Sequence, residues 1–266
     1  DIASDGDVYN ILLIGSDTRN GWYGNSDSMI LASINSQTKT IYMTSFMRDL
    51  YANIPNVGIR KLNSAYAVGG GPLLVSTIES NYRVDIDNYA SVDFSSMASI
   101  IDMVGGVDLE VSTQEAGYIN MYLDEQCRLQ GLNASDYYVA GGGITHLNGN
   151  QAVGFARIRY TSRGNEHSDY GRTSRQREIL VQLMQKARSL DATTLLAVVN
   201  NMLPLITHNI DAATLTTLIA NAPSYINYDI QTDRIPYDGL YSNLGEELVP
   251  DFEATINRLH QTIYGN

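Results

Sequence analysis

The sequence contains a single cysteine, Cys127, and only three lysines among its 266 residues. One cysteine excludes an internal disulfide and any metal site built from several thiolates. No apolar run within these residues approaches the ~20 that a transmembrane helix needs. The formal net charge is -12, which is opposite in sign to that of a typical nucleic-acid binder. We therefore expect no nucleic acid among the partners.

Several familiar catalytic patterns are also missing. Gly15-Ser16-Asp17 does not match the G-x-S-x-G turn that presents a nucleophilic serine. The glycines at 69–71 are not followed by the lysine of a phosphate-binding P-loop. The four histidines show no metal-ligand spacing. Any chemistry must therefore come from other polar residues.

Composition and hydrophobic periodicity predict a globular α/β protein, with 44% hydrophobic and 17% charged residues. Apolar, β-branched runs predict strands at 8–14, 28–35, 40–46, 89–94, 107–111, 152–160 and 229–235. Helical patterns cover 63–68, 72–81, 95–104, 174–190, 192–202, 212–221 and 251–264, with loop and some helix at 114–143. This alternation predicts an α/β/α sandwich with a central mixed sheet. We expect one domain over residues 8–266 after a polar linker at 1–7.

Arginines are concentrated in one segment of this acidic chain. Of the seventeen basic residues, six fall between positions 157 and 177: Arg157, Arg159, Arg163, Arg172, Arg175 and Arg177. The same window holds two acids, so its net charge is about +4 by six minus two. Arginine in place of lysine favours bidentate binding of oxyanions. A solvated basic face, or structural ion pairs with the surplus acids, is the alternative explanation.

The predicted elements place several of these arginines favourably for phosphate binding. Arg157 and Arg159 alternate on a predicted strand and would point to one face of the sheet. Arg172 and Arg175 would flank the start of a long helix, where free N–H groups attract phosphate. The pattern therefore indicates a site for a multiply charged phosphate ligand.

Acidic residues stand at the predicted strand ends in the first third of the chain. Asp17 follows the first strand, Asp27 precedes the second, and Arg48-Asp49 follows the third. Two carboxylates plus substrate phosphate oxygens are a usual environment for magnesium. Each aspartate alone is also explained as a turn former. Together with Arg19 and Arg48, Asp17 and Asp27 favour a Mg2+ (or Mn2+) site.

An ordered set of motifs resembles the LytR-CpsA-Psr (LCP) family of Gram-positive cell-envelope phosphotransferases. The resemblance spans roughly residues 8 to 190, and its most specific part is Asp-x-Gly-Arg-x-x-Arg-Gln after Ala-Arg-x-Arg. The matching segments are residues 11–19, 26–29, 44–49, 61–63, 92–94, 104–107, 146–152, 155–159 and 169–176.

The resemblance implies an extracytoplasmic, magnesium-dependent transferase with a hydrophobic pocket for a polyprenyl tail. The expected donor is a polyprenyl-pyrophosphate-linked glycan of teichoic acid or capsular type, and the expected acceptor is peptidoglycan or a related polymer. The apolar faces of the helices at 72–81, 95–104 and 174–190 either line the lipid pocket or are plain core. The family's usual N-terminal membrane helix is expected to precede the polar linker, at the membrane of a Gram-positive-type bacterium.

The resemblance also assigns roles to residues of this sequence. Asp17 and Asp27 match the metal-site carboxylates. The expected catalytic residues are Arg48, Asp49, Asp93, Arg157 and Arg159. The expected pyrophosphate ligands are Arg19, Arg48, Lys61, Arg157, Arg159, Arg172, Arg175 and Gln176. Whether Asp49 or Asp93 accepts the proton of the attacking hydroxyl is left open.

Two other functions remain compatible with the same residues. Water in place of the acceptor hydroxyl would make the chain a pyrophosphatase acting on lipid-linked pyrophosphate. A chain that binds the lipid-linked precursor without turnover would be a non-catalytic regulator.

Overall fold

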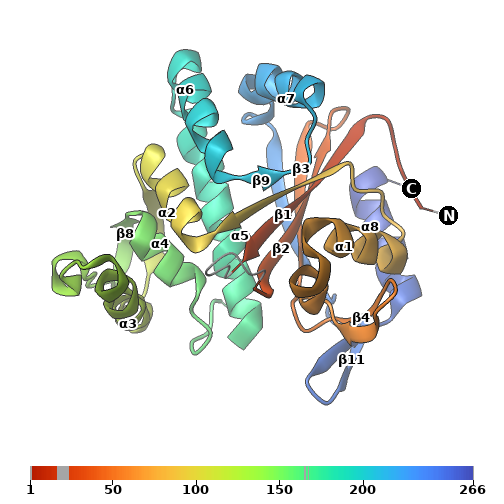
Figure 1. The fold of residues 1–266 in the computed structure, drawn as a ribbon, viewed down its shortest axis with the longest axis horizontal. Helices are drawn as coiled ribbons and strands as arrows, with labels where there is room; N and C mark the ends of the chain where they lie inside the picture. The colour runs from red at the N-terminus through yellow and green to blue at the C-terminus, as the bar shows by residue number, and fades with distance from the viewer. Residues whose placement is uncertain (1, 17–23, 165, 167, 266) are drawn as a thin grey trace. The chain divides into compact units, whose positions relative to one another are not determined.

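A computed structural model describes residues 2–16, 24–164, 166 and 168–265. The chain forms two compact units. One comprises residues 1–93 and 206–266, and the other comprises residues 94–205. Each unit has its own strands and helices (Figure 1), and the prediction of a single domain over 8–266 stays a prediction.

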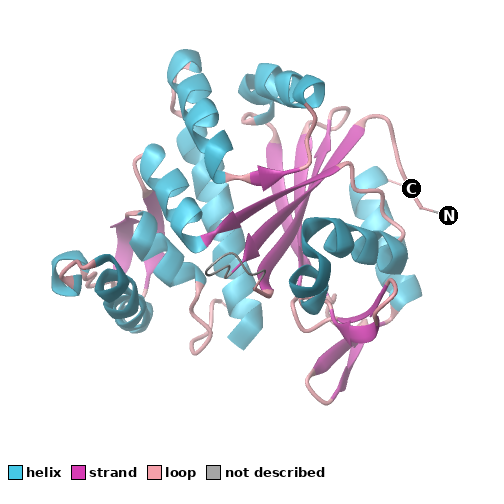
Figure 2. Cartoon of the chain, viewed as in Figure 1, coloured by secondary structure: helices cyan, strands magenta, loops and turns pink. Residues whose placement is uncertain are grey.

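The first unit is built on a mixed six-stranded sheet, drawn in magenta in Figure 2. Its strands are β1 (Val8–Ser16), β2 (Ser26–Asn35), β3 (Thr40–Phe46), β6 (Asn88–Asp93), β9 (Thr207–His208) and β10 (Asp229–Ile235). Their order is β10-β3-β2-β1-β6-β9. β2 is antiparallel to β1 and β3, and β9 is antiparallel to β6. β6 pairs parallel with β1, and β10 pairs parallel with β3. The predicted mixed sheet is confirmed, and a turn at residues 36–39 joins β2 and β3 as a hairpin.

Helices α1 (Ser64–Tyr82) and α8 (Phe252–Tyr264) cover one face of this sheet. Residues of β1 alternate between fully and partly buried, so one side of the strand faces this helical layer. Phe46 of β3 packs edge-on against Tyr82 of α1, with 4.9 Å between ring centroids. Asn10 of β1 donates its amide to the Tyr264 hydroxyl of α8 at 3.0 Å.

The opposite face carries the alternate residues of β1 and lies near α7 (Ala212–Tyr225). Tyr9 follows the rule of alternation and points away from the α8 side. Burial, together with the nearby Asp87 and Asp211 carboxylates and Tyr225, raises the pKa of Tyr9 to about 12. Residues at both ends of α7 thus lie near this second face at Tyr9, and the predicted mixed α/β architecture is confirmed.

Helix α1 contains the break predicted at its glycines. Gly69 and Gly70 have non-helical backbone angles, and Gly70 has a φ of 63°, which glycine tolerates without a steric penalty. The helix resumes around Pro72. Leu74 and Ile78 beyond it are fully buried. Of the two explanations for this apolar stripe, core packing is therefore correct for these residues.

Two small hairpins were not predicted from the sequence. They consist of β4 (Tyr51–Ile54) with β5 (Gly58–Lys61) and of β11 (Tyr241–Leu244) with β12 (Glu247–Pro250). A bridge between Leu50 and Leu248 joins the first hairpin to the second. The hairpins thus lie side by side, next to the residues that follow β3.

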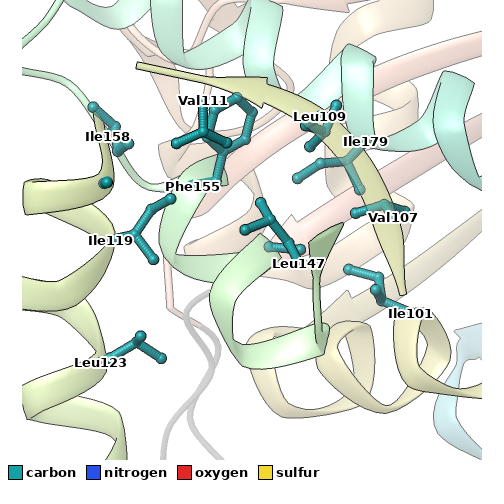
Figure 3. Packing of buried hydrophobic residues seen from close by; sticks show 12 residues of the cluster. Ile101, Val107, Leu109, Val111, Ile119, Leu123, Leu147, Phe155, Ile158 and Ile179 are labelled. Carbon is teal, nitrogen blue, oxygen red and sulfur yellow. The ribbon is translucent and has the colours of Figure 1, made fainter. Parts of the chain in front are cut away.

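The second unit packs helices around a two-stranded sheet. Its elements are α2 (Phe94–Met103), β7 (Val107–Val111), α3 (Thr113–Gln130), β8 (Gly143–Leu147), α4 (Gly149–Ala156), α5 (Ser168–Arg188) and α6 (Ala192–Met202). Figure 3 shows its core, in which Leu109 and Val111 of β7 meet Phe155 of α4 and Ile179 of α5. Ile101 of α2 belongs to the same cluster. The predicted stripes on α2 and α5 thus supply core residues.

Two predictions in this unit need correction. Residues 114–143, predicted as loop with some helix, are more helical than predicted, because α3 occupies 113–130. Residues 152–160 are not a strand, because α4 ends at Ala156 and the chain beyond it is irregular. In both places an N-terminal capping box begins the helix: Ser112 with Glu115, and Asn148 with Gln151. These reciprocal side chain–backbone bonds satisfy the free N–H groups of the first turn.

Helix α5 begins at Ser168, six residues before its predicted start. Arg172 and Arg175 therefore lie within its first two turns rather than at its N-terminus. Within the described part of the chain, no helix is both long and apolar enough to cross a membrane.

Candidate functional site

The predicted polar residues of the first unit lie at one edge of its sheet. β1, β3, β6 and β10 run in the same direction, so their carboxyl ends meet at that edge. Arg48 and Asp49 follow β3, Asp93 ends β6, and Asp27 lies near the start of the antiparallel β2. This edge is where α/β folds commonly place ligands. Asp17 and Arg19 lie outside the described residues.

An ion-paired row of side chains, Asp27–Arg48–Asp49–Lys61, runs along this edge. Arg48 Nη1 is 3.5 Å from Asp27 Oδ1, and Arg48 Nε is 3.5 Å from Asp49 Oδ2. Lys61 Nζ is 3.0 Å from Asp49 Oδ1 and 3.0 Å from Glu246 Oε2. The hydrogen bonds to Asp49 and Glu246 raise the pKa of Lys61 above its ordinary value. Cationic and carboxylate side chains thus alternate along one row.

A groove of about 510 Å³ opens beside this row. Its lining residues come from the segments around β2, β3, β5, α1 and β12: Asn25, Arg48, Asp49, Ile59, Arg60, Lys61, Asn63, Ser64 and Glu247. Asp49 therefore belongs to the ion-paired row and also lines the groove. Asp93 is not among the lining residues.

Arg157 of the second unit is held by aromatic rings. It caps the C-terminus of α4, with φ of −89° and ψ of −11°. Its guanidinium carbon lies 4.6 Å from the ring centre of Tyr122 and 5.1 Å from that of Phe94. Glu125 Oε2 is 3.3 Å from Arg157 Nη2, and the Tyr122 hydroxyl donates to the Arg157 carbonyl at 3.1 Å. Cation–π contacts of this kind attract a guanidinium to the ring faces and favour this position of Arg157.

Arg159 and Arg172 share the Asp169 carboxylate in the first turn of α5. Arg159 Nε is 3.6 Å from Asp169 Oδ1, and Arg172 Nη2 is 3.0 Å from Asp169 Oδ2. Arg172 is 2% exposed and Arg159 is 34% exposed. The predicted shared strand for Arg157 and Arg159 is absent, and Asp169 on the next helix fixes Arg159 instead.

Arg175 has a different environment from the one its motif suggested. Its side chain is fully buried, and its Nε donates to Glu115 Oε1 at 2.9 Å. The other guanidinium nitrogens donate to the carbonyls of Ile158, Thr161 and Ser162 at 3.0–3.3 Å. Four of its five N–H groups are thus engaged within the fold, and the side chain is fully buried, which argues against a direct role of Arg175 in pyrophosphate binding. Gln176, the next residue, is partly buried.

Arg163 and Arg177 are engaged in structural ion pairs. Arg163 Nε donates to Glu178 Oε1 at 2.9 Å, and Arg177 Nη2 lies 3.6 Å from Glu166 Oε2. The excess of positive charge in the 157–177 segment is therefore partly neutralised within the unit. For these two arginines and Arg175, the explanation by ion pairs is the correct one.

Sequence reasoning missed Phe94, Tyr122 and Glu125, which contact Arg157, and Glu115, which pairs with Arg175. Glu115 had a readable signal in the Ser112-x-x-Glu115 capping pattern. The three neighbours of Arg157 had none, because they contact it only through the packing of α2, α3 and α4.

The described carboxylates fit a magnesium site only in part. No group of three or more His, Cys, Asp or Glu side chains in the described residues is arranged to hold a metal ion. Magnesium commonly takes one or two carboxylates and completes its shell with waters and substrate phosphates. Asp27 suits one such ligand, and its predicted partner Asp17 lies outside the described residues.

Comparisons with known proteins agree on the relationship. A protein from Oceanobacillus iheyensis named polyisoprenyl-teichoic acid–peptidoglycan teichoic acid transferase TagU is 35% identical, over 98% of this chain and 76% of its own length. Biofilm regulatory protein A from Streptococcus mutans is 30% identical over 73% of this chain and 48% of its own length. Regulatory protein MsrR from Staphylococcus aureus is 32% identical over 70% of this chain and 50% of its own length. The chain thus spans about half the length of the latter two relatives.

Solved structures share the fold. Bacillus subtilis TagV has a TM-score of 0.73 at 24% identity and covers 98% of each chain. A structure described as TagT bound to LIIa-WTA has a TM-score of 0.74 at 21% identity, over 98% of this chain and 91% of its own. Another, described as YwtF (TagT) with bound octaprenyl pyrophosphate lipid, has a TM-score of 0.67 at 21% identity, over 98% and 92%.

A model of one family spans almost the whole sequence, with a match over residues 1–259. This match covers the edge residues Asp27, Arg48 and Asp49 as well as the arginine segment at 157–177. The chain therefore belongs to the LytR_cpsA_psr (LytR-CpsA-Psr) family.

Proposed function

We propose that this protein is a phosphotransferase that moves a phospho-glycan from a polyprenyl-pyrophosphate carrier to peptidoglycan or a related acceptor. The glycan is of teichoic acid or capsular type. The observation that carries the proposal is the row Asp27–Arg48–Asp49–Lys61, which combines phosphate-binding cations with a proton acceptor. Family membership and the name of the TagU relative support the same reaction.

Several residues of this chain suit the donor. Arg48 binds phosphate oxygens by charge-assisted hydrogen bonds worth ~1.5–3 kcal/mol each. Lys61, which pairs with Asp49, is a further proposed phosphate ligand. Arg157, Arg159 and Arg172 remain proposed pyrophosphate ligands. The apolar tail needs an apolar surface, and the sheet face opposite α1 and α8 offers Ile11 and Leu13 of β1, which are only partly buried.

The reaction is a displacement at the glycan-side phosphorus. The oxygen of an acceptor hydroxyl forms the new P–O bond, and the bond to the bridging oxygen breaks, releasing polyprenyl phosphate. The hydroxyl proton passes to a carboxylate, for which Asp49 and Asp93 are the candidates. The arginines stabilise negative charge that develops on the phosphoryl oxygens and on the leaving group.

Magnesium is part of the proposal. Asp27, together with Asp17, would hold Mg2+ (or Mn2+), with phosphate oxygens of the donor completing its shell. A bound divalent cation would supply charge neutralisation at the pyrophosphate. Removal of divalent ions with a chelator is expected to abolish transfer, and added Mg2+ is expected to restore it. Full activity in chelator would contradict the metal assignment.

We place the enzyme at the extracytoplasmic face of a Gram-positive-type cell membrane, because its donor carries a membrane-embedded tail. The regulatory names of two relatives give the alternative of a non-catalytic precursor-binding regulator some support. A pyrophosphatase would use the same residues with water as the nucleophile.

One assay separates these three functions. The protein is incubated with a polyprenyl-pyrophosphate-linked glycan, with and without a soluble peptidoglycan fragment, and the products are identified by mass spectrometry. Transfer predicts a phosphodiester-linked conjugate only when acceptor is present. Free glycan phosphate in both reactions indicates a pyrophosphatase, and unchanged donor in both indicates a regulator.

Substitution of the ligand arginines provides the internal control for this assay. Arg48→Ala is expected to lower kcat/KM by at least a hundredfold, which is about 2.7 kcal/mol of transition-state stabilisation. Arg128→Ala removes an exposed arginine of α3 and is expected to leave transfer unchanged. Equal rates in wild type and Arg48→Ala would contradict the proposed role of the ion-paired row.

A further inference from the structure

We propose that the groove beside Asp49 is the acceptor subsite and that it takes an acidic saccharide, with Arg60 binding the carboxylate of that saccharide. The inference rests on the proposed phosphotransferase function. The groove measures about 510 Å³. This volume falls within the roughly 300–1,000 Å³ that small-molecule sites occupy, so it has room for a short saccharide.

The position of the groove relates it to the reaction. Arg48 and Asp49 line the groove and also belong to the ion-paired row. A hydroxyl of a saccharide in the groove therefore lies near both a phosphate ligand and a carboxylate. In the proposed transfer, this hydroxyl forms the P–O bond and its proton passes to Asp49. Asp93 does not line the groove, so the geometry favours Asp49 as the proton acceptor.

One cation of the groove is available to an anionic ligand. Arg48, Arg60 and Lys61 provide three cations, against the carboxylates of Asp49 and Glu247. Arg48 and Lys61 are already ion-paired. Arg60 is exposed, and in the described residues it has no ion pair. Its guanidinium is thus the cation available for a bidentate contact with a ligand carboxylate.

Asn63 adds a neutral polar side chain to the groove. Asn63 occupies the N-cap position of α1, where an asparagine side chain usually accepts a backbone hydrogen bond. Here it makes no capping bond, and no described residue hydrogen-bonds its side-chain amide. The residue lines the groove, so its amide is available both to donate to and to accept from a saccharide.

The rest of the lining suits a sugar ring. Ile59 is 58% exposed and offers an apolar surface to the C–H face of a pyranose. The Ser64 hydroxyl donates to the Lys61 carbonyl at 2.6 Å, which leaves its oxygen free to accept a bond from a sugar hydroxyl. An apolar platform combined with a few fixed polar groups is typical of ligand sites.

A larger cavity in the second unit does not suit the same ligand. It measures about 610 Å³, and its charged lining residues are Glu110, Glu115, Glu178 and Arg163. The Arg163 guanidinium already pairs with Glu115 and Glu178. With acids in excess and its arginine engaged, this cavity would repel a carboxylate.

The test uses two soluble acceptors. One is an N-acetylated disaccharide with a single carboxylate, and the other is the same disaccharide with that carboxylate converted to a primary amide. Transfer kinetics are measured for wild type, Arg60→Ala, Arg60→Lys and the control Arg128→Ala. Calorimetric titration with the two disaccharides, and separately with polyprenyl pyrophosphate, measures acceptor and donor binding without turnover.

We expect Arg60→Ala to raise the KM for the acidic disaccharide about tenfold, equivalent to ~1.4 kcal/mol. The donor KM and the behaviour of Arg128→Ala should stay within about twofold of wild type. Amidation of the disaccharide should raise KM about tenfold for wild type and have no further effect on Arg60→Ala. Arg60→Lys should fall between the two, because an ammonium cannot form the bidentate contact.

The outcomes separate this inference from the proposed function. Amidation that affects wild type and Arg60→Ala equally, or no difference between the two disaccharides in calorimetry, overturns the acceptor subsite while leaving the transferase intact. A wild type that binds the acidic disaccharide through Arg60 but neither binds nor turns over the donor overturns the proposed function and leaves the subsite standing.

Discussion

Replacement of Arg175 by methionine tests the conclusion that this arginine holds the fold of the second unit together. Methionine retains most of the side-chain volume but removes every donor. Glu115 is 2% exposed, so the variant would leave a buried carboxylate without its closest cation. Breaking a buried ion pair by removing one partner typically costs ~3–5 kcal/mol. The carbonyls of Thr161 and Ser162 also lose their donors.

We therefore expect Arg175→Met to lower the free energy of unfolding by ~3–5 kcal/mol at neutral pH. Urea unfolding followed by circular dichroism measures this change. Arg128→Met, which removes an exposed arginine on α3 of the same unit, should change the free energy by less than about 0.5 kcal/mol. Arg175→Lys should recover only part of the loss, because one ammonium cannot replace a guanidinium that contacts a carboxylate and several carbonyls.

The loss of stability in Arg175→Met should depend on pH through the ionisation of Glu115. Burial raises the pKa of Glu115, but hydrogen bonds from Ser112 and Arg175 outweigh it and leave that pKa below its ordinary value. The ion pair therefore stabilises the fold above the ordinary glutamate pKa of about 4.3, and this contribution is lost as the pH falls through the lowered pKa. The difference between wild type and Arg175→Met should be largest at neutral pH and shrink below about pH 4. A difference under 1 kcal/mol at neutral pH, or one independent of pH, would refute the reasoning.

Three further predictions concern single contacts in the second unit. Ser112→Ala should lower the free energy of unfolding by about 1 kcal/mol in urea titrations, because Ser112 caps α3; no change would contradict the capping role. Gly149→Ala should destabilise by ~1–3 kcal/mol or more, since its Cβ would lie 2.0 Å from the Ala98 carbonyl oxygen. Gly117→Ala in α3 serves as the control, because Gly117 has no positive φ and an added Cβ would meet no atom within 4 Å. The hydrogen bond from Lys186, and after it that from His146, lowers the pKa of Asp108. Lys186→Met should therefore raise the pKa of Asp108 toward its ordinary value. NMR titration of the Asp108 carboxyl carbon measures this pKa, and an unchanged value would refute the contact.

Local sequence patterns predicted several strands of both units. The strands at 40–46, 107–111 and 229–235 have the predicted bounds, because short β-branched runs between turn residues leave little ambiguity. The residues 152–160 show the limit of this reasoning. A short apolar run fits a buried strand or a buried helix equally well. The Asn148–Gln151 capping box and the close approach of Gly149 to Ala98 decide for the helix.

The motifs by themselves determined the family and the position of the acidic residues at strand ends, because both depend on residue order along the chain. Only the tertiary structure distinguished the arginines from one another. Arg159 and Arg175 look equivalent in the sequence, yet Arg175 is fully buried on Glu115 and Arg159 is one-third exposed beside Asp169. A guanidinium serves a ligand or the fold according to which acceptors surround it, and here those acceptors come from distant parts of the chain brought together by packing.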